Sequence, residues 1–169
     1  SNVRPNVHLQ VRKIEHLLTS FKDLEFLVPV GMKVGDKLKK LMVFFDSIKE
    51  SIKAAEMLRA RLLPKERTKI RWFNARMSPE FREDGTQHFK DGDVYGLCVT
   101  DSFGMGVDVT DIEIIVQWQM SCDMNTLWQR FGRAAWDQSL TAIAILLVEA
   151  KYFDEAKQKA KICSEKKHK

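Results

Sequence analysis

Short apolar runs alternate with segments of helical pattern along most of this chain, and this alternation limits the folds that the chain can adopt. Several of the runs are apolar at nearly every position, which is typical of strands covered on both faces of a parallel sheet. The runs are Lys40–Phe45, Ile70–Phe73, Val94–Val99, Ile112–Trp118 and Leu140–Val148. Strands that alternate with helices at this spacing indicate right-handed crossovers. The sequence therefore predicts an α/β fold with a doubly wound, mostly parallel sheet.

An earlier run, Val7–Ile14, alternates polar and apolar residues, which predicts an edge or half-exposed strand. The stretch after it is the least regular and is expected to be a helix or an extended connection. At 169 residues the chain has the length of one ordinary domain. We expect an opening strand and connection over 1–38, an α/β core over 39–150 and a basic terminal helix over 151–169.

The helix starts are marked by capping residues. Ser47 and Glu50 form a capping box. The apolar stripe that follows consists of Ile48, Ile52, Ala55, Leu58 and Leu62. Ser78 and Pro79 are an N-cap and a first-turn proline, and Asp123 can cap a later helix. Folds of this class place their functional sites on the loops at the carboxyl ends of the strands. The loops after the apolar runs are therefore the first place to look for chemistry.

Composition excludes several classes of protein. The three cysteines show no C-x-x-C spacing, which argues against a disulfide scaffold and a zinc finger and suits a reducing intracellular compartment. No apolar run approaches the roughly 20 residues of a membrane span. The start lacks a signal pattern and an initiator Met, so we expect a piece of a longer chain. The net charge of +5 suits a polyanionic partner, and a solvated lysine-rich surface explains it equally well.

The loop after the run Val94–Val99 carries the first candidate site. Glycines at 104 and 106 let the backbone turn tightly and approach a ligand, while Thr100 and Asp108 offer a hydroxyl and a carboxylate. A glycine turn with a capping aspartate is the simpler alternative.

The second candidate site lies in the segment 129–137. On a helix Arg130 and Arg133 are three residues apart and share a face, with Gln129 beside Arg133. Two neighbouring guanidiniums suit bidentate binding of phosphate, although an arginine-bearing solvated face is the usual alternative. Gly132 inside such a helix costs about 1 kcal/mol relative to Ala, which close approach to a ligand or a neighbouring element would explain.

In this order the two segments resemble motifs V and VI of superfamily 2 helicases, in their RecQ-like form. Phe103-Gly-Met-Gly106 resembles motif V, and Gln129-Arg-Phe-Gly-Arg133 resembles motif VI. Arg4-Pro-Asn-Val7 resembles the R-x-N segment that opens the second RecA-like lobe. Leu41–Ser47 resembles motif IV, and Ala75-Arg-Met-Ser-Pro79 resembles the H-A-G-M segment. Over nearly its whole length the chain is similar to the RecA-like C-terminal lobe, of the P-loop NTPase type.

The resemblance implies a nucleotide site shared between two lobes. Arg133 and Arg130 would be arginine fingers toward the γ-phosphate, with Gln129 beside them as the third catalytic residue. Gly106 and Asp108 would bind the nucleotide, the latter at the ribose. The implied cofactor is ATP with Mg²⁺, and the magnesium ion would be held by the first lobe. No metal site is expected on this chain, whose scattered histidines have no companion ligands.

The resemblance also implies a nucleic-acid partner. Thr100 would contact a phosphate, and Ser47 and Arg76 would lie along the strand backbone. The implied function is that of a lobe in an ATP-dependent 3′-to-5′ DNA helicase, with single-stranded or duplex DNA and its own N-terminal lobe as partners and no membrane. The expected location is intracellular, and nuclear if the organism is eukaryotic. The alternatives are a degenerate, non-catalytic binding or scaffold module and the lobe of an RNA helicase.

Two positions depart from the family's pattern. The third motif VI arginine is replaced by Trp136, which cannot donate charge to a phosphate, and the histidine before Ala75 is replaced by Asn74. The first change is the main support for the degenerate alternative.

The sequence predicts that this chain alone hydrolyses no ATP. It contains neither G-x-x-x-x-G-K followed by Ser or Thr nor a D-E-x-H or D-E-x-D motif, so the phosphate cradle and the magnesium ligands are missing. Phosphate release by the purified chain should equal the background of a no-enzyme sample, with and without nucleic acid. Steady turnover stimulated by nucleic acid would contradict the half-site prediction.

Overall fold

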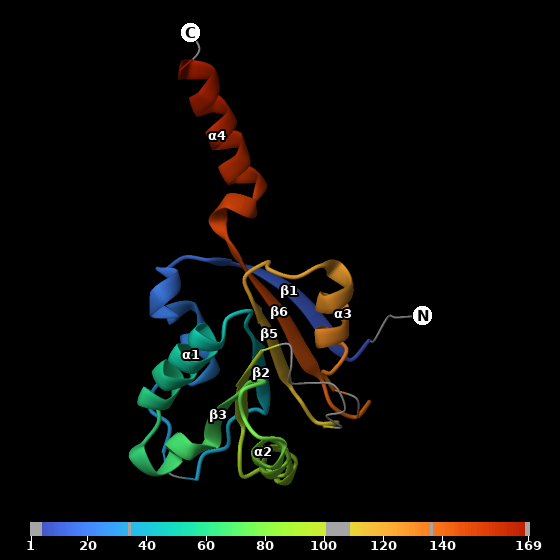
Figure 1. The fold of residues 1–169 in the computed structure, drawn as a ribbon. Helices are drawn as coiled ribbons and strands as arrows, with labels where there is room; N and C mark the ends of the chain where they lie inside the picture. The colour runs from blue at the N-terminus through green and yellow to red at the C-terminus, as the bar shows by residue number, and fades with distance from the viewer. Residues whose placement is uncertain (1–4, 34, 101–108, 136, 168–169) are drawn as a thin grey trace.

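A six-stranded, all-parallel sheet forms the centre of the computed structural model, which describes residues 5–33, 35–100, 109–135 and 137–167 (Figure 1). The strand order is β1-β6-β5-β2-β4-β3, and every pair in it is parallel. The strands are β1 Val7–Ile14, β2 Leu41–Phe44, β3 Ile70–Phe73, β4 Gly96–Val99, β5 Ile114–Trp118 and β6 Ala142–Glu149. The predicted α/β class and parallel sheet are confirmed.

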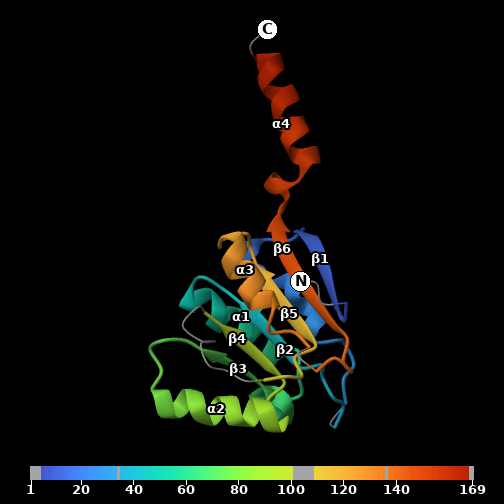
Figure 2. The ribbon, with the colours of Figure 1, turned by 90° about the vertical axis from the view of Figure 1, so that its right-hand side faces the viewer.

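Helices cover both faces of the sheet, which makes it doubly wound (Figures 1 and 2). The helices are α1 Ile48–Ala60, α2 Pro79–Asp91, α3 Met124–Phe131 and α4 Asp154–Lys167. One apolar cluster joins the sheet to α1, and a second joins the opposite face to α2 and α3. None of the helices in the described ranges is long and apolar enough to cross a membrane.

The central strand β2 shows why the runs lack polar residues. All four of its residues are buried, because Leu41 and Val43 belong to the α1 cluster while Met42 and Phe44 belong to the opposite one. The edge strand β1 differs, since it pairs only with β6 and leaves Leu9 and Val11 more than half exposed. The sequence prediction of an edge strand there is confirmed.

The irregular stretch after β1 folds into two 3₁₀ turns, Leu18–Ser20 and Lys22–Leu27, in place of the expected helix or extended connection. Phe21 lies between the turns in the left-handed region, with φ 54°. Its buried ring packs at 5.3 Å from Trp118 and 6.1 Å from Phe45, measured between ring centroids. Burial of this ring anchors the stretch to the core, although Phe21 belongs to no periodic pattern in the sequence.

Two helix details differ from the prediction. The buried face of α1 contains Ser51, Ala54, Ala55 and Leu58, while the predicted stripe member Ile52 is only half-buried. The terminal helix α4 begins at Asp154, because the preceding residues Ala150–Tyr152 form a 3₁₀ turn.

The contact between α2 and β3 yields a test of the packing. Gly85 is buried within α2, and a Cβ at this position would overlap the ring of the fully buried Phe73. We expect Gly85→Ala to lower the free energy of unfolding by about 1–2 kcal/mol, because overpacking outweighs the roughly 1 kcal/mol gained in helix propensity. Urea denaturation measures this change. In a Phe73→Leu background the same substitution should not lower the free energy of unfolding further. An equal decrease in both backgrounds would contradict the assigned contact.

Candidate functional site

The carboxyl ends of β2 and β5 form the topological switch point of the sheet. The chain leaves β2 through α1 toward β3 at one edge of the sheet, and it leaves β5 through α3 toward β6 near the other edge. The two strands are hydrogen-bonded neighbours, so their outgoing connections diverge on opposite faces. Open α/β sheets bind their ligands in the crevice that such divergence leaves. The predicted site residues that the structure describes can be placed relative to this point.

Arg130 of α3 is buried at the switch point and is 3% exposed. Its Nη1 donates a hydrogen bond to Oε1 of Gln117, and its Nη2 lies 3.7 Å from Oδ1 of Asp46. The guanidinium carbon also lies 5.0 Å from the ring centroid of Phe44. The side chain therefore joins α3 to the ends of both β2 and β5. These contacts hold the helix against the sheet.

Arg130 and Arg133 do not share a helix face, in contrast to the prediction from their spacing. Helix α3 ends at Phe131, and Gly132 is its C-cap, so the expected glycine inside a helix is also absent. Arg133 follows in a tight turn in which its backbone NH donates to the carbonyl of Arg130 at 3.2 Å. The third predicted residue, Gln129, lies on α3 with its side chain exposed. The two arginines thus have different environments: Arg130 is buried and holds α3 against the sheet, and Arg133 is half-buried in the turn that follows.

Burial lowers the pKa of the half-buried Arg133 guanidinium from its ordinary value. That ordinary value is so high that the group remains cationic near neutral pH. A cation in a partly desolvated position attracts an anion more strongly than a fully solvated one does. Arg133 is therefore a half-buried cation in the turn that follows α3.

The turn after α3 is held in place by Asn6. The Asn6 amide Nδ2 donates to the carbonyl oxygens of Ala135 at 2.9 Å and Leu140 at 3.0 Å. The backbone NH of Ala135, which has φ 43°, donates to the carbonyl of Ile112 at 2.9 Å. This asparagine was noted in the sequence only as part of an R-x-N pattern, and here it fixes the segment that follows Arg133.

The three predicted strand contacts lie after three neighbouring strands. Ser47 follows β2, Thr100 follows β4 and Arg76 follows β3, and these strands are adjacent in the sheet in that order. Neighbouring strands are about 4.8 Å apart, so the three positions form a row along the carboxyl edge. The structure brings these candidates together as a group.

Their environments differ. The Ser47 Oγ accepts a hydrogen bond from the Glu50 backbone NH at 3.3 Å and so caps α1, as the capping box predicts. Thr100 is buried at the end of β4, whereas the Arg76 side chain is exposed. The backbone NH of Arg76 donates to Oδ1 of the buried Asn74 at 3.0 Å. The asparagine that replaces the family's histidine therefore shapes the turn that presents Arg76.

Acidic groups also line this edge. Burial is the main cause that raises the pKa of the Glu50 carboxyl, and the nearby charge of Asp46 raises it further. The predicted nucleotide-binding residues Gly106 and Asp108, and the departure at Trp136, lie outside the described residues. Within the described ranges no group of His, Cys, Asp and Glu side chains could hold a metal ion.

Gln117 is the residue of the candidate site that the sequence did not single out, whereas Asp46 lies in the loop after the run Lys40–Phe45, one of the loops to which the sequence directs attention. Gln117 is fully buried in β5, and its Nε2 donates to the carbonyl oxygens of Trp118 at 3.2 Å and Gln119 at 3.1 Å. These bonds shape the turn that leads into α3, where Gln119 has φ 67°. The available signal was one polar residue inside the apolar run Ile114–Trp118, because a buried amide requires partners.

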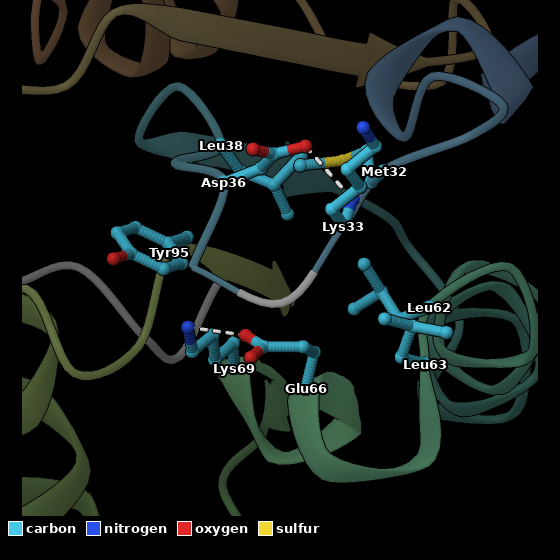
Figure 3. Close-up of a pocket in the computed structure, with 9 residues that line it drawn as sticks. All are labelled: Met32, Lys33, Asp36, Leu38, Leu62, Leu63, Glu66, Lys69 and Tyr95. Carbon is cyan, nitrogen blue, oxygen red and sulfur yellow. Dashed lines mark hydrogen bonds and ion pairs between the residues drawn. The ribbon is translucent and has the colours of Figure 1, made fainter.

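The cleft drawn in Figure 3 lies at the opposite, amino edge of the sheet. Among its lining residues Leu38 precedes β2, Lys69 precedes β3 and Tyr95 precedes β4. Lys69 pairs with Glu66, and this hydrogen bond raises the pKa of the lysine. The cleft is therefore remote from the switch point and takes no part in the candidate site.

Comparison with known proteins shows which family and which relatives the chain is similar to. Residues 16–136 match the family described as helicase conserved C-terminal domain. The chain is 31% identical over 96 residues to an uncharacterized ATP-dependent helicase of Methanocaldococcus jannaschii, which covers 56% of this chain and 14% of that protein. It is 39% identical over 56 residues to the pre-mRNA-splicing ATP-dependent RNA helicase PRP28 of Cryptococcus neoformans, covering 33% of this chain and 8% of that protein. It therefore spans at most about a seventh of these relatives.

A solved structure shows the same fold. Domain 2 of the DEAD-box helicase Mss116p, bound to an RNA duplex, superposes with a TM-score of 0.67 and 16% identity. The match covers 86% of this chain and 55% of that chain. The predicted helicase C-terminal lobe is thus confirmed, whereas these relatives do not support its RecQ-like and DNA-specific parts.

The buried bridge of Arg130 leads to a prediction about stability. Arg130→Met removes the partner of Gln117 and Asp46, so we expect the free energy of unfolding to fall by about 2–4 kcal/mol. Gln129→Ala on the same helix is the matched control, because its side chain is exposed and its loss should change stability by no more than roughly 0.5 kcal/mol. Equal denaturation midpoints for the two variants would show that the bridge does not support the fold.

Proposed function

The chain belongs to the helicase conserved C-terminal domain family, and from this premise we propose that it is the second motor lobe of an ATP-dependent helicase that acts on RNA. The observation that carries the proposal is the match over residues 16–136, which includes the strands from β2 to β5 and the whole of α3. The activity requires the first lobe, because this chain has no P-loop.

Arg133 is the proposed arginine finger. A finger must carry charge into a cleft from which water is partly excluded, where it stabilises negative charge on the transferring phosphoryl group. Support for this role comes from the partial burial of Arg133, and from Arg130, which fixes the end of the helix α3 just before it. ATP with Mg²⁺ would supply the phosphoryl group, and the metal ligands would come from the first lobe.

The row formed by Ser47, Thr100 and Arg76 is the proposed path of the nucleic-acid strand. It offers two hydroxyl groups and a guanidinium at the ends of three adjacent strands. Hydroxyls and arginines are common ligands of backbone phosphate, and such contacts position a strand without specifying its sequence. The path lies beside the switch point, and Asp46, which pairs with Arg130 of α3, directly precedes Ser47.

RNA is proposed as the substrate because the descriptions of two of the similar proteins name it. PRP28 is an RNA helicase by its name, and Mss116p domain 2 was solved with an RNA duplex. DNA is the second candidate, since the Phe103-Gly-Met-Gly106 segment resembles the RecQ-like form of motif V. The row of strand contacts suits either backbone.

ATP hydrolysis by the natural full-length protein tests the proposal. Single-stranded RNA should stimulate turnover more than DNA of the same sequence, and Arg133→Ala should lower kcat by roughly 10³–10⁵, as loss of a finger does in other phosphoryl-transfer enzymes. Phosphate release is the measurement. Lys65→Ala is the matched control, because Lys65 is exposed at the amino edge and its loss should leave kcat unchanged.

The other outcomes separate the alternatives. Stronger stimulation by DNA would replace RNA with the second candidate. Nucleic-acid binding without any hydrolysis would indicate the degenerate module that Trp136 makes conceivable. A variant lacking Arg133 that turns over like wild type would remove this residue from the nucleotide site.

A further inference from the structure

Most of the net charge of the chain is concentrated in its last nineteen residues. Residues 151–169 contain seven lysines and three carboxylates, so they carry +4 of the total of +5. The lysines are Lys151, Lys157, Lys159, Lys161, Lys166, Lys167 and Lys169. The rest of the chain is nearly neutral, with twenty-one basic and twenty acidic residues. The basic character of this protein is thus local, and most of it belongs to helix α4 and its flanks.

Helix α4 leaves the domain at its functional edge. It follows the carboxyl end of β6, and in two perpendicular views it extends away from the sheet (Figures 1 and 2). The side chains of residues 157–167 are all exposed. Because all strands are parallel, this end of β6 lies at the same edge as Ser47, Thr100 and Arg76. The helix therefore adds positive charge at the same edge of the sheet as the proposed strand path, with β5 between β6 and the first strand of that path.

The pattern of α4 does not suit an apolar partner. Lys157 and Lys161 share one side of the helix, and Lys159 and Lys166 lie on the opposite side. The side chain of Ile162 is 53% exposed, and no apolar stripe accompanies it. A helix of this length is only marginally stable in water when it packs against nothing. A helix that is polar on all sides gains no stability from a hydrophobic groove. Charge is what α4 offers to a partner.

We propose that α4 binds the phosphate backbone of the nucleic acid on which the helicase acts, and so extends the strand path beyond the sheet. This inference rests on the proposed function. Lysine ammonium groups act as mobile point charges, which suits binding to phosphate without base recognition. Fourteen helical residues span about 21 Å, so the helix can reach phosphates that the row at the sheet edge cannot.

The salt dependence of RNA binding by the natural full-length protein tests this proposal. One variant changes Lys157, Lys159 and Lys161 to Gln, which retains helix propensity and removes three charges. Its charge-matched control changes Lys39, Lys65 and Arg67 to Gln, three exposed residues at the amino edge. The Kd for a single-stranded oligouridylate is measured from about 50 to 400 mM salt, because each phosphate contact on a single strand contributes about 0.7 to the slope of log K against log salt.

We expect the slope of log K against log salt to become shallower by about 2 in the α4 variant and to stay unchanged in the control. A variant in which the same three lysines are replaced by arginine should have the wild-type slope. Equal slopes in wild type and the α4 variant, or equal changes in the α4 variant and the control, would overturn the role of α4 and leave the helicase assignment standing. Failure of the wild-type protein to bind either RNA or DNA would instead overturn the proposed function.

Discussion

The buried guanidinium of Arg130 is the interaction on which the candidate site depends. A charge inside a protein must be paired and hydrogen-bonded, and here Gln117, Asp46 and the ring of Phe44 meet this requirement from two strands. Since β2 and β5 send their connections to opposite faces, α3 needs side-chain contacts to stay beside the end of β2. Arg130 provides a polar link there in addition to the apolar packing of Leu127 and Phe131, and Asn6 holds the turn that follows Arg133.

The two edges of the sheet differ in how their charges are paired. The carboxyl edge carries the exposed Arg76 and the departure of the basic helix α4, together with the carboxylates of Asp46 and Glu50. The amino edge is stabilised by internal pairs, such as Lys40 with Asp111 at 2.9 Å and Lys69 with Glu66. Lys40 is buried and has its charge neutralised there, so it contributes no attraction for a polyanion. Charge that is already paired holds a fold together, and charge left in solvent is available to a partner.

Much of the fold could be predicted from the sequence because local chemistry decides it. The strand runs are apolar since both faces of the sheet are covered, and Ser47, Ser78 and Asp123 cap helices through bonds to NH groups three residues ahead. The sequence made no prediction where the structure depends on a distant contact. Phe21 belongs to no periodic run, yet its ring completes a cluster with Phe45 and Trp118.

The sequence by itself determined the class of fold, because periodicity and capping are local properties. Its resemblance to superfamily 2 helicases indicated the C-terminal lobe, whereas the RecQ-like branch is not supported by the relatives. Only the tertiary structure decided where each arginine of the 129–133 segment lies. Spacing placed Arg130 and Arg133 on one helix face, but α3 ends between them, and the buried amide of Gln117 takes up the first guanidinium. The end of a helix and the partner of a buried charge are set by residues distant in the chain, and no local pattern records them.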